Sequence, residues 1–501
     1  MRHNSLKRIL QAAVLAVMFS GNTAYADPWT PMNDLGLRGD IELLADFDVI
    51  HGPITTWPIP WGQLASDLNT AGDMALPPHV MAALQRVRGY LPVEEDFNRT
   101  RLGGNIAVTN KESFLRDFGA GARDQFDLSV SAQHQWSSTF VKLQAGRQFD
   151  THGGSWKLDG SYAAQLVGNW IFYAGAIDQW WGPGWASSLI LSNNARPMPR
   201  MGFMRNNPKP IDLPVLRWLG PWQLSSSIAV MNGPRTDYKN PLLANIRLSF
   251  NPTRRLEIGM FHDFQFCGEG RLCNFKQFLT NFGVAGLSEN INSGDPLTDP
   301  GNVMSGLDFR YGWRMKTITS SIYGQLYAED SSSTTLFKST SYLAGFSVAA
   351  PLQKPGWSMR LVGEYANTVA LSELLTGHNQ YNMMYDHYIF LYGYRYRGKS
   401  VGASQDNDSH LTSLMLSLNA PNNVRYGLKY HHAALNLDDA VLVLNSGSMN
   451  RKIVNIVEAS VDVPTDMGAF KVTLRAQDNQ PNSLRDAHLS AAIEGRWDFL
   501  F

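Results

Sequence analysis

The chain of 501 residues lacks several features that would place it in a common protein class. Basic and acidic residues number 43 each. No basic stripe or nucleic-acid-binding motif is present, so nucleic acid is excluded as a partner. Beyond residue 26 no long uncharged apolar run occurs, and we therefore expect no helical membrane span. The sequence has only two cysteines, too few for a structural zinc site without other ligands nearby.

Catalytic motifs are also missing. The sequence has no G-x-S-x-G nucleophile elbow, no H-E-x-x-H zinc motif and no Walker glycine loop. The adjacent His431 and His432 would point to opposite faces of a strand, so they do not form one metal site. We therefore predict no cofactor, no metal and no enzymatic activity. An outer-membrane hydrolase stays open as an alternative, because paired carboxylates can meet in space without being close in sequence.

The first 26 residues have the pattern of a secretory signal peptide. Arg2, Lys7 and Arg8 precede the apolar run Ile9–Phe19, which is too short to span a bilayer. Residues 24–26, Ala-Tyr-Ala, then provide the small residues of a cleavage site. A signal peptide without a later helical span indicates a periplasmic, secreted or outer-membrane protein.

Residues 27–95 contain three short apolar patterns with helical spacing. Asp34 is a suitable N-cap for a first helix with Leu37 and Ile41 on one face, and the pair Pro77-Pro78 begins a third helix. Such short helices bury too little surface to be stable alone. We therefore expect them to form a small periplasmic helical plug that packs against another part of the chain.

From about residue 100 the apolar period changes from 3.6 to 2. Apolar and polar residues alternate in 126–133 and again in 242–250, and we expect Trp156 and Tyr162 to share the apolar face of one strand. Runs of about ten alternating residues match strands that cross a bilayer with the apolar face outward and the polar face inward. Residues 96–501 are therefore predicted to form an all-β transmembrane barrel.

The number and order of the strands raise two questions. About nineteen candidate strands conflict with the even number expected of bacterial single-chain barrels. The run 187–192 alternates poorly, and omitting it leaves about 18 antiparallel strands. The alternation of upward and downward strands cannot be continued between Ser358 and Leu418. Either Val369–Asp386 is an unusually long periplasmic connection or one strand in this region is misread.

The last predicted strand carries Leu489, Ile493, Trp497, Phe499 and the terminal Phe501 on one face. A terminal aromatic with aromatics two and four residues before it resembles the recognition signal of outer-membrane barrels. This pattern predicts that the protein is an integral barrel of the outer membrane. Its expected partners are then outer-membrane lipid and the machinery that assembles barrels.

Cys267 and Cys273 are separated by a short Gly- and Arg-containing segment. Export through a signal peptide would bring them into an oxidising compartment, where two nearby cysteines form a disulfide. We therefore expect a small looped disulfide in an external connection of the barrel.

Two stretches combine side chains that suit an acidic sugar polymer. In Gln179–Pro199 three tryptophans surround a Gly-Pro-Gly turn, and in Tyr394–Lys399 tyrosines alternate with cations. Aromatic rings stack on apolar faces, amides donate and accept hydrogen bonds, and arginine pairs with carboxylates. The predicted carbohydrate-binding residues are Trp180, Trp181, Trp185, Asn193, Asn194, Arg196, Tyr394, Arg395, Tyr396 and Arg397. Alternatively, the tryptophans anchor a tight loop at the membrane interface, and the arginines line the lumen.

The same stretches, with Leu37–Asp46 and Pro53–Trp61, resemble the Wzi family of outer-membrane capsule-assembly proteins. The similarity spans most of the chain after the signal peptide. It implies an 18-stranded barrel with a periplasmic helical plug, which binds capsular polysaccharide like a lectin and holds it at the cell surface. A carbohydrate-selective porin is the main alternative, because inward-facing charges of both signs can line a pore or fill a blocked lumen.

Overall fold

The computed structural model describes residues 27–500, except for 72–73, 92–97, 99, 120, 151–152, 283–300, 330–338, 374–376, 439–450, 466–467, 480 and 482–488. The predicted signal peptide and Phe501 lie outside the described residues. The boundary expected near residue 95 falls within an undescribed segment, so the division into plug and barrel domains stays a prediction.

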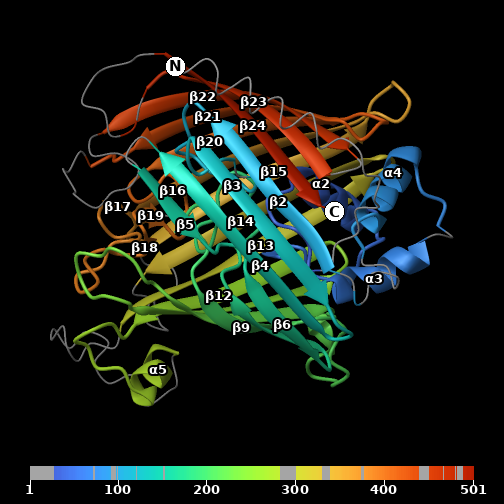
Figure 1. The fold of residues 1–501 in the computed structure, drawn as a ribbon. Helices are drawn as coiled ribbons and strands as arrows, with labels where there is room; N and C mark the ends of the chain where they lie inside the picture. Colours follow the sequence, from blue (N-terminus) through green and yellow to red (C-terminus); the bar gives the residue numbers. More distant parts are fainter. Residues whose placement is uncertain are drawn as a thin grey trace.

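Three helices near the N-terminus lie together at one end of the molecule, on the right in Figure 1. They are α2 (Leu35–Asp46), α3 (Trp61–Thr70) and α4 (Pro78–Arg88). Asp34 caps α2 as predicted, because its carboxylate accepts hydrogen bonds from the backbone N–H groups of Gly36 and Leu37. Leu37, Leu64 and Leu84 have no exposed surface, which confirms that each helix buries its apolar face.

The wall of the molecule is a single antiparallel sheet that closes on itself. Its strands are β2 (Thr100–Thr109), β3 (Phe126–Gln135), β4 (Thr139–Asp150), β5 (Gly153–Lys157), β6 (Tyr162–Val167), β7 (Trp170–Gly175), β9 (Arg200–Arg205), β10 (Trp222–Val230), β11 (Leu242–Thr253), β12 (Leu256–Phe266), β13 (Asn302–Met315), β14 (Ile318–Glu329), β15 (Thr340–Pro351), β16 (Ser358–Leu371), β20 (His410–Asn419), β21 (Arg425–Leu435), β22 (Lys452–Thr465), β23 (Gly468–Gln477) and β24 (Ser490–Leu500). Pairing of β2 with β24 closes the barrel. With β5 and β6 as two halves of one strand, the barrel has 18 strands, which confirms the predicted fold.

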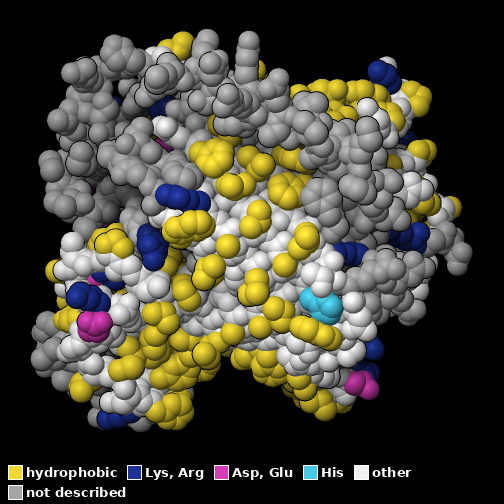
Figure 2. Space-filling model, in the orientation of Figure 1, with side chains coloured by type: hydrophobic (Ala, Val, Ile, Leu, Met, Phe, Trp, Pro, Cys, Tyr) yellow, Lys and Arg dark blue, Asp and Glu magenta, His cyan; other side chains and the backbone are white. Residues whose placement is uncertain are grey.

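The wall is apolar outside and polar inside, the reverse of a soluble protein. On β3 the outward Val130 is 56% exposed and the inward Asp127 is 6% exposed; Leu474 and Arg475 on β23 show the same contrast. Figure 2 shows hydrophobic side chains spread over the outer surface of the wall, with charged side chains mainly toward its two ends. This pattern matches a surface surrounded by hydrocarbon. Among the described residues, no helix is long and apolar enough to cross a membrane.

One predicted strand face is wrong. Trp156 on β5 points outward and is 73% exposed, whereas Tyr162 on β6 points inward and is 6% exposed. The reason is that the pairing with β4 shifts by one residue between β5 and β6, across 158–161. Such a shift turns every later side chain of the same strand to the opposite face of the sheet. Tyr162 thereby donates a hydrogen bond to Asp27 and lies 4.9 Å from the ring of Trp29 inside the barrel.

The conflict in strand order between Ser358 and Leu418 is resolved as a misread strand. β16 pairs directly with β20, and the segment 372–409 between them does not cross the wall. It contains the short strand β17 (Asn379–Gln380) and a hairpin of β18 (Arg395–Tyr396) and β19 (Lys399–Ser400). Figure 1 places β17, β18 and β19 at the end of the barrel opposite the helices.

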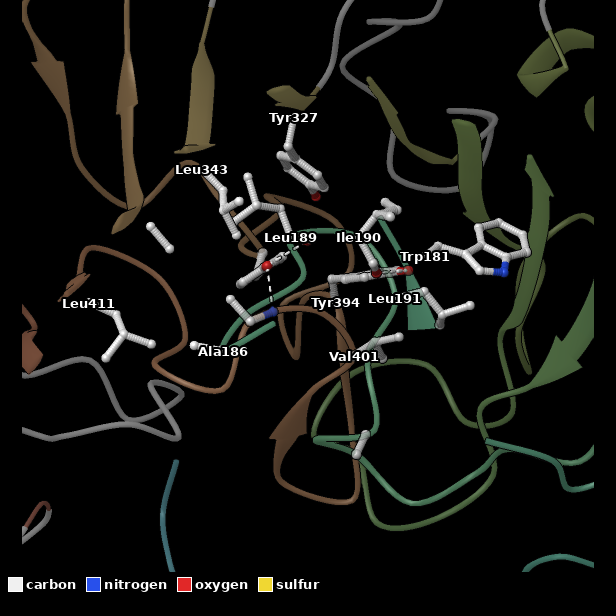
Figure 3. Packing of buried hydrophobic residues seen from close by; sticks show 14 of the residues in the cluster. Trp181, Ala186, Leu189, Ile190, Leu191, Tyr327, Leu343, Tyr394, Val401 and Leu411 are labelled. Atoms are coloured by element: carbon white, nitrogen blue, oxygen red, sulfur yellow. Dashed lines mark hydrogen bonds between the residues drawn. The ribbon is translucent and has the colours of Figure 1, made fainter. Parts of the chain in front are cut away.

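Connections of the barrel fold into its lumen. The segments 110–125, 176–199 and 372–409 contribute to one buried apolar cluster with inward-facing residues of the wall, and Figure 3 shows part of this cluster. The run 187–192 belongs to the cluster and not to the wall, as its poor alternation predicted. The lumen is therefore occupied from the end opposite the helices as well as from the helical end.

The predicted disulfide between Cys267 and Cys273 is confirmed. It lies in the connection between β12 and β13, at the end of the barrel opposite the helices. The bond closes a small loop that begins directly after the last residue of β12.

Candidate functional site

The tryptophan-rich turn is held between the helical plug and the wall. Its strand β8 (Trp180–Trp181) pairs with β1 (Thr56–Trp57), which precedes α3. The guanidinium of Arg38 on α2 donates hydrogen bonds to the carbonyl oxygens of Pro183 and Gly184 at 2.6 and 2.8 Å. The indole N–H of Trp180 donates to the same carbonyl of Gly184 at 2.9 Å. These contacts define the path of the chain before it enters the apolar cluster.

One carboxylate of the wall anchors the chain directly after the turn. Glu364 on β16 accepts hydrogen bonds from the backbone N–H groups of Trp185, Ala186 and Ser187 at 2.6, 3.1 and 2.7 Å. The hydroxyl of Tyr323 donates a fourth hydrogen bond to Glu364 at 2.9 Å. Three consecutive N–H groups that converge on an anion form a strong local anchor. These bonds compensate the burial of the carboxylate.

The two predicted motifs pack against each other although they lie about 200 residues apart in the sequence. The hydroxyl of Tyr394 donates to the carbonyl of Ile190 at 2.9 Å, and the side-chain amide of Asn194 donates to the carbonyl of Ser400 at 2.8 Å. Figure 3 shows Tyr394 and Val401 beside the run from Leu189 to Leu191. The first motif is therefore the base on which hairpin β18–β19 rests.

Arg395 fixes this hairpin from the inside. Its side chain is 1% exposed and makes ion pairs with Asp406 at 2.8 Å and with Asp386 at 2.6 Å. Burial alone would lower the pKa of Arg395, but the two carboxylates outweigh burial and raise it. In this conformation Arg395 thus stabilises the hairpin through its two ion pairs.

The tip of hairpin β18–β19 is the exposed part of the second motif. Arg397 has a φ of 51°, and its guanidinium lies 5.5 Å from the ring centre of Tyr396, to whose hydroxyl it donates at 3.1 Å. Arg397 and Lys399 are both exposed. Neither makes an ion pair with any residue that the structure describes. The tip therefore presents two positive charges that form no ion pair with a described carboxylate, although the charges of Asp406, Glu112, Arg116 and Arg123 act on Lys399 at longer range.

Most of the predicted carbohydrate-binding residues are closed to a ligand in this conformation. The residues at most 4% exposed are Trp180, Trp181, Trp185, Asn193, Asn194, Tyr394, Arg395 and Tyr396. Arg196 is half-buried and donates two hydrogen bonds to Asp159, at 2.8 and 2.9 Å, while Arg397 is exposed. The alternative of tryptophans at the membrane interface is wrong, because their rings lie inside the barrel. Sugar binding by the ten residues stays a prediction.

Two exposed aromatic residues were missed in the sequence analysis. Tyr381 is 39% exposed and Tyr388 is 52% exposed, and both belong to the segment 372–409 that carries the hairpin. A signal was available in the sequence, because this long segment holds aromatic residues among polar ones without the alternation of a wall strand. Lys399 belongs to the second motif but was not among the predicted carbohydrate-binding residues.

The charges inside the wall form ion pairs with one another. Arg247 pairs with Asp308 at 2.6 Å, and Lys157 pairs with Asp127. This favours a charge network in a blocked lumen over the lining of a pore. A cavity of about 840 Å³, lined by side chains of both charges, lies between the helices and the wall. The described part of the chain contains no group of three or more His, Cys, Asp or Glu residues placed to hold a metal ion.

A closed antiparallel barrel with an apolar outer face and a lumen filled from both ends defines the class of plugged outer-membrane β-barrels. Within this class the sequence gives a family assignment. The model of the family "Capsule assembly protein Wzi" matches residues 102–481, and the chain belongs to this family.

Two known proteins illustrate the similarity. An uncharacterised 55.8 kDa protein of the cps region of Klebsiella pneumoniae is 29% identical over 333 residues, which cover 64% of this chain and 62% of that protein. The second is the structure of Wzi from Escherichia coli, described as an outer-membrane protein involved in group 1 capsule assembly and as a carbohydrate-binding β-barrel. It has a TM-score of 0.77 and 22% identity, and the match covers 94% of this chain and 99% of that one. At this identity the similarity shows the fold.

Proposed function

We propose that the protein binds an acidic capsular polysaccharide at its outer mouth and retains it at the cell surface without cleaving it. In this proposal a signal peptide directs export, the assembly machinery inserts the barrel into the outer membrane, and the helices face the periplasm. The segment 372–409 then lies outside the cell. The observation that carries the proposal is the tip of hairpin β18–β19, where Arg397 and Lys399 are exposed and form no ion pair with any described residue, while Arg395 holds the hairpin by buried ion pairs.

The chemistry of this mouth suits a charged sugar polymer. The guanidinium of Arg397 can hold a uronate carboxylate with two hydrogen bonds, and the ammonium of Lys399 can pair with a second one. Tyr381 and Tyr388 in the same segment offer ring faces for sugars. Each exposed contact contributes about 1 kcal/mol, and a polymer with repeated charges adds many such contacts into durable retention.

The buried motif residues support this surface indirectly. Tyr394 and Asn194 join the two motifs by hydrogen bonds, and Arg395 holds the hairpin through Asp386 and Asp406. A preorganised hairpin loses little conformational entropy when a polymer binds. In this view Trp180 to Arg196 set the position of the cations, and the predicted direct contacts of these residues with sugar would require the lumen segments to open.

The test compares capsule that stays on cells with capsule released into the medium. The double variant Arg397→Ala/Lys399→Ala should release capsule, while Arg397→Lys/Lys399→Arg keeps both charges and should retain it. Binding of the polymer to the isolated parent protein should weaken in high salt, because the charges are exposed. Heat-modifiability on gels shows whether each barrel is folded.

Two outcomes would contradict this function. If the folded alanine variant retains capsule like the parent, the tip is not the binding surface. If deletion of the whole protein also leaves retention unchanged, capsule binding itself is wrong. A shortened polymer after incubation with the parent protein would instead support a hydrolase.

A carbohydrate-selective porin is the second candidate, and the filled lumen speaks against it. Segments 176–199 and 372–409 form a buried cluster across the lumen, and the inward charges of the wall pair with each other. We expect the purified parent protein to show no large steady conductance in a planar bilayer. A large steady conductance would favour the porin.

A further inference from the structure

The described part of the connection between β12 and β13, residues 267–282, folds back onto the outside of the barrel. Its helix α5 (Phe275–Asn281) follows the disulfide loop, and Figure 1 shows it beside the wall at the end opposite the other helices. The ring of Phe278 lies 5.4 Å from that of Phe264 and 5.9 Å from that of Phe266. These two residues are on the outward face of β12, yet they are only 1% and 4% exposed. α5 therefore covers the outer wall.

Several contacts fix this segment in place. His262 on the outward face of β12 makes a hydrogen bond with the carbonyl of Asn281 at 2.7 Å. The guanidinium of Arg271, inside the disulfide loop, lies 4.9 Å from the ring centre of Tyr238 and 4.7 Å from that of Phe390. The segment is thus attached both to the wall and to neighbouring connections, and its outer side has a defined orientation.

The outer side of this segment is apolar. Phe275 is 73% exposed, Leu272 is 53% exposed and Phe282 is 44% exposed. The rings of Phe275, Phe278 and Phe282 form a ladder with successive centres 6.1 Å apart. Lys276 beside them is exposed and makes no ion pair with any residue of the described chain. Exposed aromatic ladders are unfavourable in water and mark surfaces that contact another apolar phase.

We propose that α5 and the disulfide loop before it dock onto lipid of the outer leaflet. The rings of Phe275 and Phe282 would lie among acyl chains, and the ammonium of Lys276 would pair with a lipid phosphate at the interface. The proposal rests on the orientation of the barrel given above but not on polysaccharide binding. It adds a lipid-binding surface to a protein whose proposed ligand is a sugar polymer.

The position of the segment on the wall argues for lipid over a protein partner. Below α5 the same outer face continues with Met260 and Phe309, which are 52% and 38% exposed on a surface that faces hydrocarbon. At the opposite end of this wall, Trp218 is 61% exposed and packs 5.8 Å from Phe250 on β11. Both ends of the same strands therefore carry aromatic side chains folded against the outer face, as at two membrane interfaces.

The spacing of these two covered positions fits a bilayer. Ala244 on β11 pairs with Phe264 under α5, and Phe250 on the same strand lies under Trp218. Six residues of extended strand span about 20 Å along the strand, which a tilt of about 40° reduces to about 15 Å along the membrane normal. Both covered positions therefore lie within the apolar band of outer-membrane barrels, which is about 25 Å tall, and the exposed rings at each end would extend toward its two borders.

Photocrosslinking in isolated outer membranes tests the proposal. p-Benzoylphenylalanine replaces Phe275 in one variant and Tyr388 in a matched control, an exposed aromatic at the mouth; both replacements keep an aromatic ring. We expect the Phe275 variant to form adducts with outer-leaflet lipid, identified by mass, in at least tenfold excess over the control. Adducts between two copies of the chain, adducts with inner-leaflet phospholipid, or equal lipid labelling at both positions would overturn the proposal.

A charge variant tests the phosphate contact separately. In the crosslinking background, Lys276→Glu should lower the lipid adduct severalfold, whereas Lys276→Arg should leave it unchanged. Heat-modifiability again reports folding. If Lys276→Glu folds and crosslinks like the parent, the contact with phosphate is wrong. Loss of capsule retention in the hairpin variants does not affect this outcome, so the two proposals can fail independently.

Discussion

The barrel is closed at both ends, and the two closures use different interactions. At the helical end, α2 contacts the wall through ion pairs: Asp46 with Arg310 at 2.8 Å and Asp34 with Arg425 at 3.0 Å. At the opposite end, the folded-in connections form an apolar cluster and are tied to the wall by the hydrogen bonds of Glu364. Ion pairs set the orientation of a small plug, whereas apolar packing fills the opposite end of the lumen.

Because the two closures use different interactions, they are sensitive to different changes. Ion pairs that are partly exposed weaken with salt and with protonation of their carboxylates. The apolar closure is insensitive to salt, but it depends on the few polar groups that satisfy its buried backbone. Changes at single residues should therefore affect the two ends in distinguishable ways.

The largest effect is expected at the apolar closure. Glu364→Ala leaves the backbone N–H groups of residues 185–187 buried without their acceptor, which should cost about 3–5 kcal/mol of local stability. We expect the segment to leave the lumen and a steady conductance to appear in planar bilayers. Glu364→Gln retains an acceptor oxygen and should open the lumen less. A folded alanine variant that stays as non-conducting as the parent would contradict this account.

A smaller effect is expected at the ion-paired closure. Arg425 is 17% exposed and pairs with Asp34 and Asp40, so Arg425→Ala should cost about 2 kcal/mol, measured as faster proteolysis of the helical region. High salt should speed proteolysis of the parent and hardly change the variant, while Arg425→Lys should resemble the parent.

The same ion pair gives the helical end an acid dependence. Burial alone would raise the pKa of Asp34, but Arg425 and hydrogen bonds outweigh it and lower the pKa below its usual 3.8. A carboxyl with a lowered folded pKa contributes stability above its unfolded pKa and loses that contribution as the pH falls through the folded value. In the parent, proteolysis of the helical region should therefore rise only below about pH 4, and Arg425→Ala should shift this rise to higher pH. Equal acid profiles would contradict the pairing.

The smallest effect concerns pH at the opposite end. Burial raises the pKa of Asp408 to about 7, and the carboxylates of Asp438 and Asp386 add to this rise. Because the folded pKa exceeds the unfolded one, the stability that this carboxyl contributes falls as the pH rises from about 4 to about 7. Hydrogen exchange in 377–409 should be faster at pH 8 than at pH 5, and Asp408→Asn should remove the difference. A pH dependence that persists in this variant would refute the assignment.

The elements that depend on local pattern were predictable from the sequence. Strand faces follow from alternation, as at Val130 and Asp127, and the start of α2 follows from Asp34, because each signal lies within a few residues. The inward orientation of Tyr162 was not predictable. One residue inserted between β5 and β6 turns the following side chains to the other face of the strand, and the amino-acid composition does not reveal such an insertion.

Which residues belong to the candidate site could be predicted from the sequence, but which of them are exposed to solvent could not. The two motifs meet in the structure, yet Trp185 and Asn194 are buried by partners that lie far away in the sequence, such as Glu364 and Ser400. When a polar motif is buried by residues far away in the sequence, the neighbouring residues do not reveal it. The same residue types also occur on open sugar-binding surfaces. The exposed tip at Arg397 could be recognised only once the hairpin was placed.

The anchor between Glu364 and the backbone of residues 185–187 also carries a consequence for the order of folding. Its hydrogen bonds join positions 177 to 179 residues apart, and the bond from Asn194 to Ser400 spans 206 residues. Contacts of such sequence separation form late, because the chain entropy of the intervening segment is lost before they stabilise anything. The segment 176–199 emerges early in synthesis but acquires its binding partners only when β16 and β20 have joined the sheet. By the same argument the pairing of β2 with β24 forms later still, because its hydrogen bond from Asn105 to Asp498 spans 393 residues, so segment 176–199 can take its place in the lumen before the barrel closes around it.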